Sequence, residues 1–140
     1  MIMLSVSIAL ALSSVERDIR PLLHSQGFEW TLEKADAEIE YIGDIQQGRR
    51  TYRIYLYNAV NRESLHGINR FIIFLNKTIY LGVYDSGSAH DCRVEKQAVV
   101  CEVDYPGRRI QFTRNGPPLR LWLDGDIMTF WLAPRFKRPR

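Results

Sequence analysis

The feature that most constrains this chain is a series of short alternating runs separated by turn residues. Apolar and polar residues alternate within each run, which is the pattern of a half-buried β-strand. The eight runs are residues 38–42, 52–57, 70–75, 78–84, the hairpin 92–101, 109–114, 119–123 and 126–132. The sequence shows no helical pattern long enough for a strand–helix–strand unit. We therefore expect a mainly β fold, a single antiparallel eight-stranded meander barrel or sandwich.

One domain accounts for the length of the chain. The sequence has 140 residues, of which 46% are hydrophobic, and no linker divides it. This is the usual size of a single domain with its own core. Ser14 is expected to cap a short N-terminal helix that extends to about His24 and is limited by Pro21. We expect the β-domain, with this helix, to span residues 13–134.

The N-terminal residues 1–12 read MIMLSVSIALAL and contain no charged side chain. They end in a small-x-small triplet, Ala9-Leu10-Ala11, and the chain becomes polar directly afterwards. The pattern is typical of the apolar core and cleavage site of a secretory signal peptide, although no Lys or Arg precedes it. We expect a periplasmic or secreted protein. The alternative is a cytoplasmic protein that buries this segment as an N-terminal helix or strand.

Membrane insertion is not expected in the mature chain. A helix that crosses a bilayer needs about 20 consecutive apolar residues. The run at residues 1–12 is shorter than that, and the rest of the sequence has no longer one. No stable membrane span is therefore expected.

The two cysteines, Cys92 and Cys101, can be tested for pairing from their spacing. A two-residue turn at Lys96 and Gln97 places them opposite each other as a non-hydrogen-bonded pair, with Cα atoms about 4.5 Å apart. That separation suits a disulfide, which fits an oxidising compartment. On this register Val94, Val99 and Val103 share their face. The alternative is two reduced cysteines in the core.

The positive charge is concentrated in the last six residues. The formal net charge is +3, from 19 Lys and Arg against 16 Asp and Glu. Residues 135–140 hold four of the basic side chains, and removing these leaves 15 basic against 16 acidic groups. We expect a basic disordered tail at 135–140. Nucleic acid is a less favoured partner, because a globular nucleic-acid binder carries its cations on a face of the fold.

Two strand registers place aromatic and Arg side chains away from the expected core. In the run 52–57, Tyr52, Ile54 and Leu56 form one face, and Arg53, Tyr55 and Tyr57 form the other. The last hairpin turns at Asp124-Gly125, the strongest hairpin signal in the chain. On this register Leu121 faces Met128 and Leu119 faces Phe130 as a core face. The opposite face carries Arg120, Trp122, Ile127, Thr129 and Trp131.

These outer faces supply the candidate binding residues. They are Arg53, Tyr55, Tyr57, Arg120, Trp122 and Trp131. Trp, Tyr and Arg carry much of the binding energy at protein interfaces. Two structural interpretations compete with binding. The residues form ordinary cross-strand pairs, or they form a second core layer against the N-terminal segment.

Catalysis, metal binding and a cofactor are not expected. The segment 84–91 contains Ser, His and Asp side chains, but it lacks the G-x-S-x-G pattern of a nucleophile elbow. Turn chemistry accounts for its Asp, Ser and Gly residues. The spacing of the His and Cys residues does not match a metal site.

Several turns and strands together resemble a known type of protein. The runs 70–74 and 80–84, the cysteine hairpin, Asn115-Gly116-Pro117-Pro118 and Leu123-Asp124-Gly125 carry the resemblance. Over residues 38–132 the chain resembles uncharacterised small exported bacterial β-domain proteins, which implies a periplasmic β-domain and no activity. The C-type lysozyme inhibitors are similar in size and style. Ser86-Gly87-Ser88 lacks the flanking pattern of their inhibitory loop, so no residue is carried over.

Together these patterns predict a non-enzymatic, inhibitor-like binding module for a protein or glycan of the cell envelope. A structural accessory protein of the envelope is one alternative. A cytosolic nucleic-acid-binding β-barrel is another. A contiguous exposed patch of Arg53, Tyr55, Trp122 and Trp131 would favour the binding module, and burial of all four would favour the structural protein.

Overall fold

A computed structural model describes most of the chain. The described residues are 19–28, 38–60, 67–87, 90–102, 108–123 and 126–137. The predicted signal peptide at residues 1–12 lies outside them, as do residues 138–140 of the predicted tail. A 3-10 turn, Pro134–Phe136, overlaps the start of that tail, and the Arg135 guanidinium lies 5.9 Å from the ring centre of Phe136.

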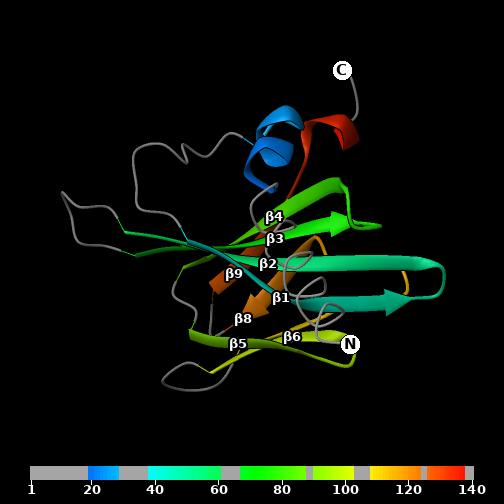
Figure 1. Ribbon diagram of the computed structural model, residues 1–140. Helices are drawn as coiled ribbons and strands as arrows, with labels where there is room; N and C mark the ends of the chain where they lie inside the picture. The colour runs from blue at the N-terminus through cyan, green and yellow to red at the C-terminus, as the bar shows by residue number, and fades with distance from the viewer. Residues whose placement is uncertain are drawn as a thin grey trace, which may run out of the picture.

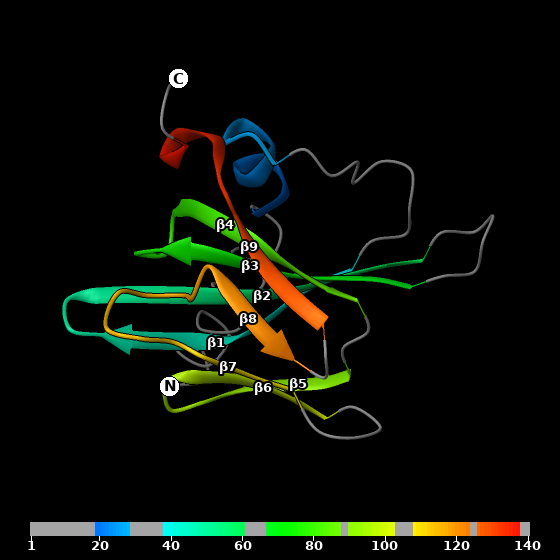
Figure 2. The same cartoon turned by 180° about the vertical axis from the view of Figure 1, so that it is seen from behind.

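The described residues form nine strands in two antiparallel sheets (Figures 1 and 2). The strands are β1 (Glu38–Gln47), β2 (Arg50–Val60), β3 (Gly67–Leu75), β4 (Ile79–Gly87), β5 (His90–Glu95), β6 (Ala98–Glu102), β7 (Arg108–Gln111), β8 (Arg120–Leu123) and β9 (Asp126–Leu132). The larger sheet has the order β1-β2-β3-β4-β9-β8, and the smaller has β5-β6-β7.

This topology confirms the mainly β, antiparallel prediction and corrects the rest of it. The prediction of a single eight-stranded barrel or sandwich in meander order was wrong in the number of strands and in their order. The cysteine hairpin contributes two strands, and these pair with β7 to form a separate sheet. β9 returns to pair with β4, so the meander is interrupted after β4. The two sheets therefore do not close into one hydrogen-bonded ring.

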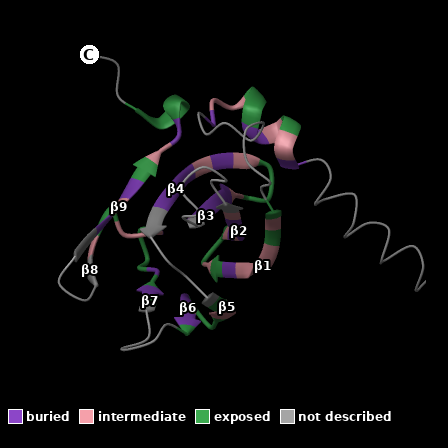
Figure 3. Cartoon of the chain, turned by 90° about the vertical axis from the view of Figure 1, so that its left-hand side faces the viewer, coloured by how far each residue is buried: buried purple, intermediate pink, exposed green. Residues whose placement is uncertain are grey.

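The main core lies between the two sheets, which curve around a shared interior (Figure 3). Its buried members come from both sheets and from the segment after β7. They are Ile45, Tyr52, Ile54, Leu56, Phe71, Ile73, Tyr84, Val99, Cys101, Ile110, Phe112, Met128 and Phe130. The predicted inward face of β2 and the inward face of the cysteine hairpin are confirmed by this set. Val103 lies outside the described residues.

A second core covers the outer face of the larger sheet. Residues 19–25 are helical and, with Phe28, pack over β2, β3 and β4. The helix passes through Pro21 and ends at Ser25, close to the predicted end at about His24. It ends in two hydrogen bonds, from Gly27 N to His24 O and from Phe28 N to Leu23 O, with Gly27 at a φ of 86°. This is the Schellman arrangement that glycine favours.

Beside this packing, the Gln26 side chain, directly after the helix, hydrogen-bonds to the sheet. The Gln26 amide donates from Nε2 to Thr78 O at 2.8 Å, and its Oε1 accepts from Tyr80 N at 2.8 Å. Because both partners belong to the backbone at the start of β4, Gln26 acts there as a substitute strand neighbour. Residues 19–28 thus pack as part of the same domain as the sheet.

A β-bulge in β1 brings the two sheets together. The register with β2 shifts between Tyr41 and Gly43, which reverses the alternation of inward and outward side chains along β1. Gly43 has a φ of 146°, and a Cβ atom built on it would lie 2.9 Å from Val94 Cβ on β5. Glycine is therefore needed at this close approach between the sheets.

The registers of the predicted hairpins agree with the structure, and the differences lie at the ends of two strands. Leu121 pairs with Met128 and packs against the main core as predicted. Leu119 is 58% exposed, so its predicted place in the core face was wrong. It precedes β8, which is the edge of the sheet, and no further strand covers it. β4 also extends to Gly87, into the segment predicted as a loop.

Candidate functional site

The predicted binding residues share one face of the six-stranded sheet. One row of register partners crosses the sheet from β2 to β9: Tyr55, Ile72, Val83 and Trp131. Arg120 pairs with Thr129, which lies two residues before Trp131, so all three belong to this same face. The pairing of β4 with β9 brings the candidates on β2 and those on β8 and β9 onto one sheet, a relation that the sequence alone did not give.

The middle of this face is covered, which corrects the expected exposure of two candidates. Tyr55 and Tyr57 are only 2% and 3% exposed. Their rings make edge contacts with Phe74 at 5.6 Å and with Phe28 at 6.0 Å between ring centres. Burial raises the pKa of Tyr57. Over β2 to β4 this face is therefore the second core layer that the sequence offered as an alternative.

Arg53 lies on the same face, in the β1–β2 hairpin. Its Nε and Nη2 donate to Asp44 Oδ1 and Oδ2 at 3.1 and 3.4 Å, and its guanidinium lies 5.2 Å from the ring centre of Tyr41. Burial and the Asp44 carboxylate raise the pKa of Tyr41. Since the Arg53 side chain is 16% exposed and already paired, it offers little to a ligand. Strict alternation would place Tyr41 and Asp44 on opposite faces of β1, but the bulge at Gly43 lets both contact Arg53.

The open part of the face lies on β8 and β9. Trp131 is 56% exposed, and Arg120 is also exposed. The backbone of Trp131 is held closely by β4, because a Cβ atom on Gly82 would lie 2.5 Å from its carbonyl oxygen. The backbone of Trp122 pairs with Ile127, but its side chain lies outside the described set. A fixed strand thus presents an indole to solvent on the same face as a guanidinium.

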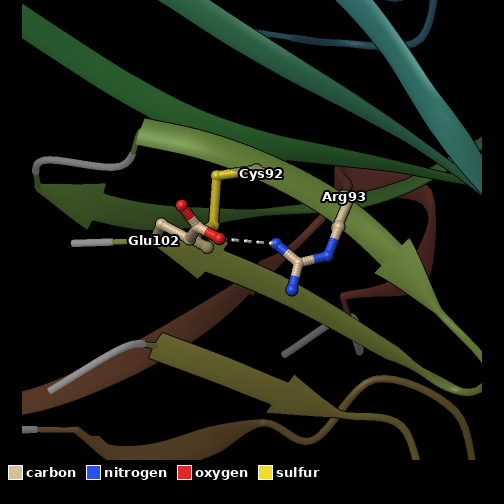
Figure 4. Close-up of a disulfide and its surroundings, with 4 residues drawn as sticks. Cys92, Arg93 and Glu102 are labelled. Carbon is tan, nitrogen blue, oxygen red and sulfur yellow. Dashed lines mark hydrogen bonds and ion pairs between the residues drawn. A yellow bond between two sulfur atoms is a disulfide. The ribbon is translucent and has the colours of Figure 1, made fainter.

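The cysteine pair forms the predicted disulfide in the structure (Figure 4). Cys92 and Cys101 are register partners with their Cα atoms 4.0 Å apart. Cys101 is buried in the main core. Arg93, next to Cys92, donates to Glu102 at 3.4 Å and to Glu95 at 2.9 Å. These exposed ion pairs contribute little to stability, so the hairpin depends chiefly on its core contacts and on the disulfide.

The described residues give no arrangement suited to metal chemistry. Among them, no three His, Cys, Asp or Glu side chains gather where they could hold an ion. In the segment 84–91, β4 ends at Gly87 and β5 begins at His90, and the side chains of residues 85–90 lie outside the description. Within the same described ranges, no helix has the length and apolar character needed to cross a membrane.

Comparisons of the chain with protein-family models, with curated proteins and with solved structures gave no match. The resemblance to small exported bacterial β-domains stays a prediction. Function is therefore inferred from the chemistry of the exposed surfaces.

Proposed function

We propose that this protein is a non-enzymatic binding module of the cell envelope, which holds a partner protein through the outer face of β8 and β9. The observation that supports this proposal is the 56% exposure of Trp131 on β9, a strand with neighbours on both sides. Burial of a large apolar side chain contributes about 1.5–3 kcal/mol, which the isolated domain forgoes here. Trp and Arg are enriched among the residues that dominate protein interfaces, and Arg120 is exposed on the same face.

The test places a photo-crosslinking amino acid at position 131 in the native host. We expect one protein adduct there and none with the crosslinker at Gln111, an exposed residue on the other sheet. Trp131→Ala should weaken capture of the isolated partner about 30-fold, the effect of losing about 2 kcal/mol at a hot spot. Trp131→Phe should capture the partner with an affinity between those of the parent protein and Trp131→Ala. A glycan partner would leave position 131 without a protein adduct and would overturn the choice of a protein.

The disulfide supports a location outside the cytosol. Disulfides persist in oxidising compartments, and Cys92 and Cys101 are bonded in the fold. Together with the signal-like residues 1–12, this favours a periplasmic or secreted protein.

Intact mass measurement of the protein from its own host tests this location. We expect a mass that lacks residues 1–11, and thiols that an alkylating label reaches only after reduction. A full-length mass with two reactive thiols would contradict export.

A structural accessory protein of the envelope is the second candidate. Burial of Tyr55 and Tyr57 and the pairing of Arg53 with Asp44 favour it, because they leave only part of the predicted aromatic and Arg face open. Under this alternative, position 131 gives no specific adduct, and Trp131→Ala changes no interaction of the protein.

A further inference from the structure

Four chain reversals gather at one end of the molecule, on the right in Figure 1 and on the left in Figure 2. They are residues 48–49, 76–78, 96–97 and 113–116. Two backbone hydrogen bonds join them in pairs through residues beside the turns, from Asn76 N to Thr51 O at 2.7 Å and from Phe112 N to Gln97 O at 2.8 Å. The turn at 113–116 approaches β2, since a Cβ atom on its Gly116 would lie 2.6 Å from the Tyr52 hydroxyl. We call this surface the four-turn end.

Within the four turns every charged side chain is a cation: Arg49, Lys77, Lys96 and Arg114. Arg50, which directly follows the first turn, adds a fifth cation, and all five are exposed. Among the residues that the structure describes, none of the five forms an ion pair. Glu95, the acidic residue next to Lys96, is paired with Arg93 at 2.9 Å. A chain whose charge is close to balanced outside its tail thus segregates cations at one end.

Both lysines among these cations occupy left-handed backbone positions that do not suit lysine. Lys77 has a φ of 76° and Lys96 a φ of 54°. Glycine takes such left-handed positions without steric cost, as Gly48 and Gly116 do in the other two turns at φ values of 61° and 100°. Turn formation therefore does not explain why lysine stands at these two positions. A role for the positive charge would explain it.

We propose that the four-turn end docks on an anionic lipid surface, with its five cations facing the headgroup phosphates. The cations stand on the tips of separate turns rather than along one groove, which suits a planar array of charge more than a single polymer chain. The described residues of these turns include no aromatic side chain on which a base could stack. The disulfide also favours a compartment away from nucleic acid. The Trp131 face is a separate surface, so this proposal does not depend on the proposed function.

Vesicle sedimentation of the full folded chain tests the proposal. We expect binding at low salt to vesicles of equal parts phosphatidylcholine and phosphatidylglycerol, and none to pure phosphatidylcholine. Binding should weaken as salt rises, because exposed charges are screened. Each cation near such a surface strengthens partitioning about fivefold, so Arg49→Gln with Arg50→Gln should weaken it about 25-fold. Arg93→Gln with Arg109→Gln removes the same charge from the outer face of the smaller sheet and should have little effect.

A turn variant separates charge from folding. Lys96→Gly should raise the urea midpoint by relieving the left-handed position and still weaken vesicle binding about fivefold. Three results would overturn the proposal: no binding to the anionic vesicles at low salt, equal losses in the two double variants, or displacement from vesicles by duplex DNA at matched phosphate concentration. The last result would identify nucleic acid as the occupant.

Discussion

Gly43 sets how closely the two sheets approach each other. Its φ of 146° is strained for other residues, and an added Cβ would lie 2.9 Å from Val94 Cβ and Cγ2. Gly43→Ala should therefore lower the free energy of unfolding by about 2 kcal/mol in urea titrations. Gly48→Ala is the matched control, since its φ is 61° and nothing lies within 4 Å of the added Cβ. It should lose about 1 kcal/mol. Equal losses would mean that the contact with Val94 is unimportant.

Single residues also show where prediction from sequence stops. The pairing of Cys92 with Cys101 could be predicted, because turn length and alternation fix a local register. The burial of Tyr55 and Tyr57 could not. Alternation identifies the residues that share a face, but the cover over this face comes from a helix distant in sequence. The sequence places Lys96 in a turn, but the gathering of the turn cations at one end depends on the sheet order.

At the scale of elements, the β5–β6 hairpin is the unit that the disulfide constrains. Its bond closes a loop over a sequence separation of 9. Replacing both cysteines with alanine should lower the free energy of unfolding by about 2–3 kcal/mol in urea titrations, because the unfolded chain regains conformational entropy. Reductant should shift the parent protein to a similar midpoint and leave the variant unchanged. A variant that still responded to reductant would contradict this account.

Hairpins were predictable elements, whereas the connections between them were not. The turns at residues 96–97 and 124–125 carry local signals that determine their strand pairs. The pairing of β4 with β9 joins strands that are separated in sequence by the whole smaller sheet, so no local signal predicts it. A single eight-stranded meander barrel or sandwich was expected for this reason, and two sheets of six and three strands were found.

At the scale of the whole molecule, buried and partly buried tyrosines limit the stability of the fold at alkaline pH. Burial raises the pKa of Tyr84, Tyr57 and Tyr41 above 10.0. The unfolded chain loses these protons first, so their contribution is complete below pH 10 and declines as pH rises toward the higher folded values. We expect the urea midpoint to fall above about pH 10.

Tyr84→Phe provides the control for this alkaline loss. The variant should start less stable, because the Tyr84 hydroxyl donates to Pro118 O and the variant leaves that carbonyl without its donor. Its midpoint should then fall less steeply than that of the parent, since phenylalanine cannot ionise. Parallel slopes would exclude Tyr84 as a source of the alkaline loss.

The open sheets leave strand edges that could recruit other chains into aggregates. β7 and β8 are edge strands of only four residues each. The other two edges, β1 and β5, are longer, and each carries a bulge that interrupts its pairing register. Short and bulged edges are poor templates for edge-to-edge polymerisation. The bulge that brings the two sheets together therefore also helps to keep β1, the longest edge strand, from starting a fibril.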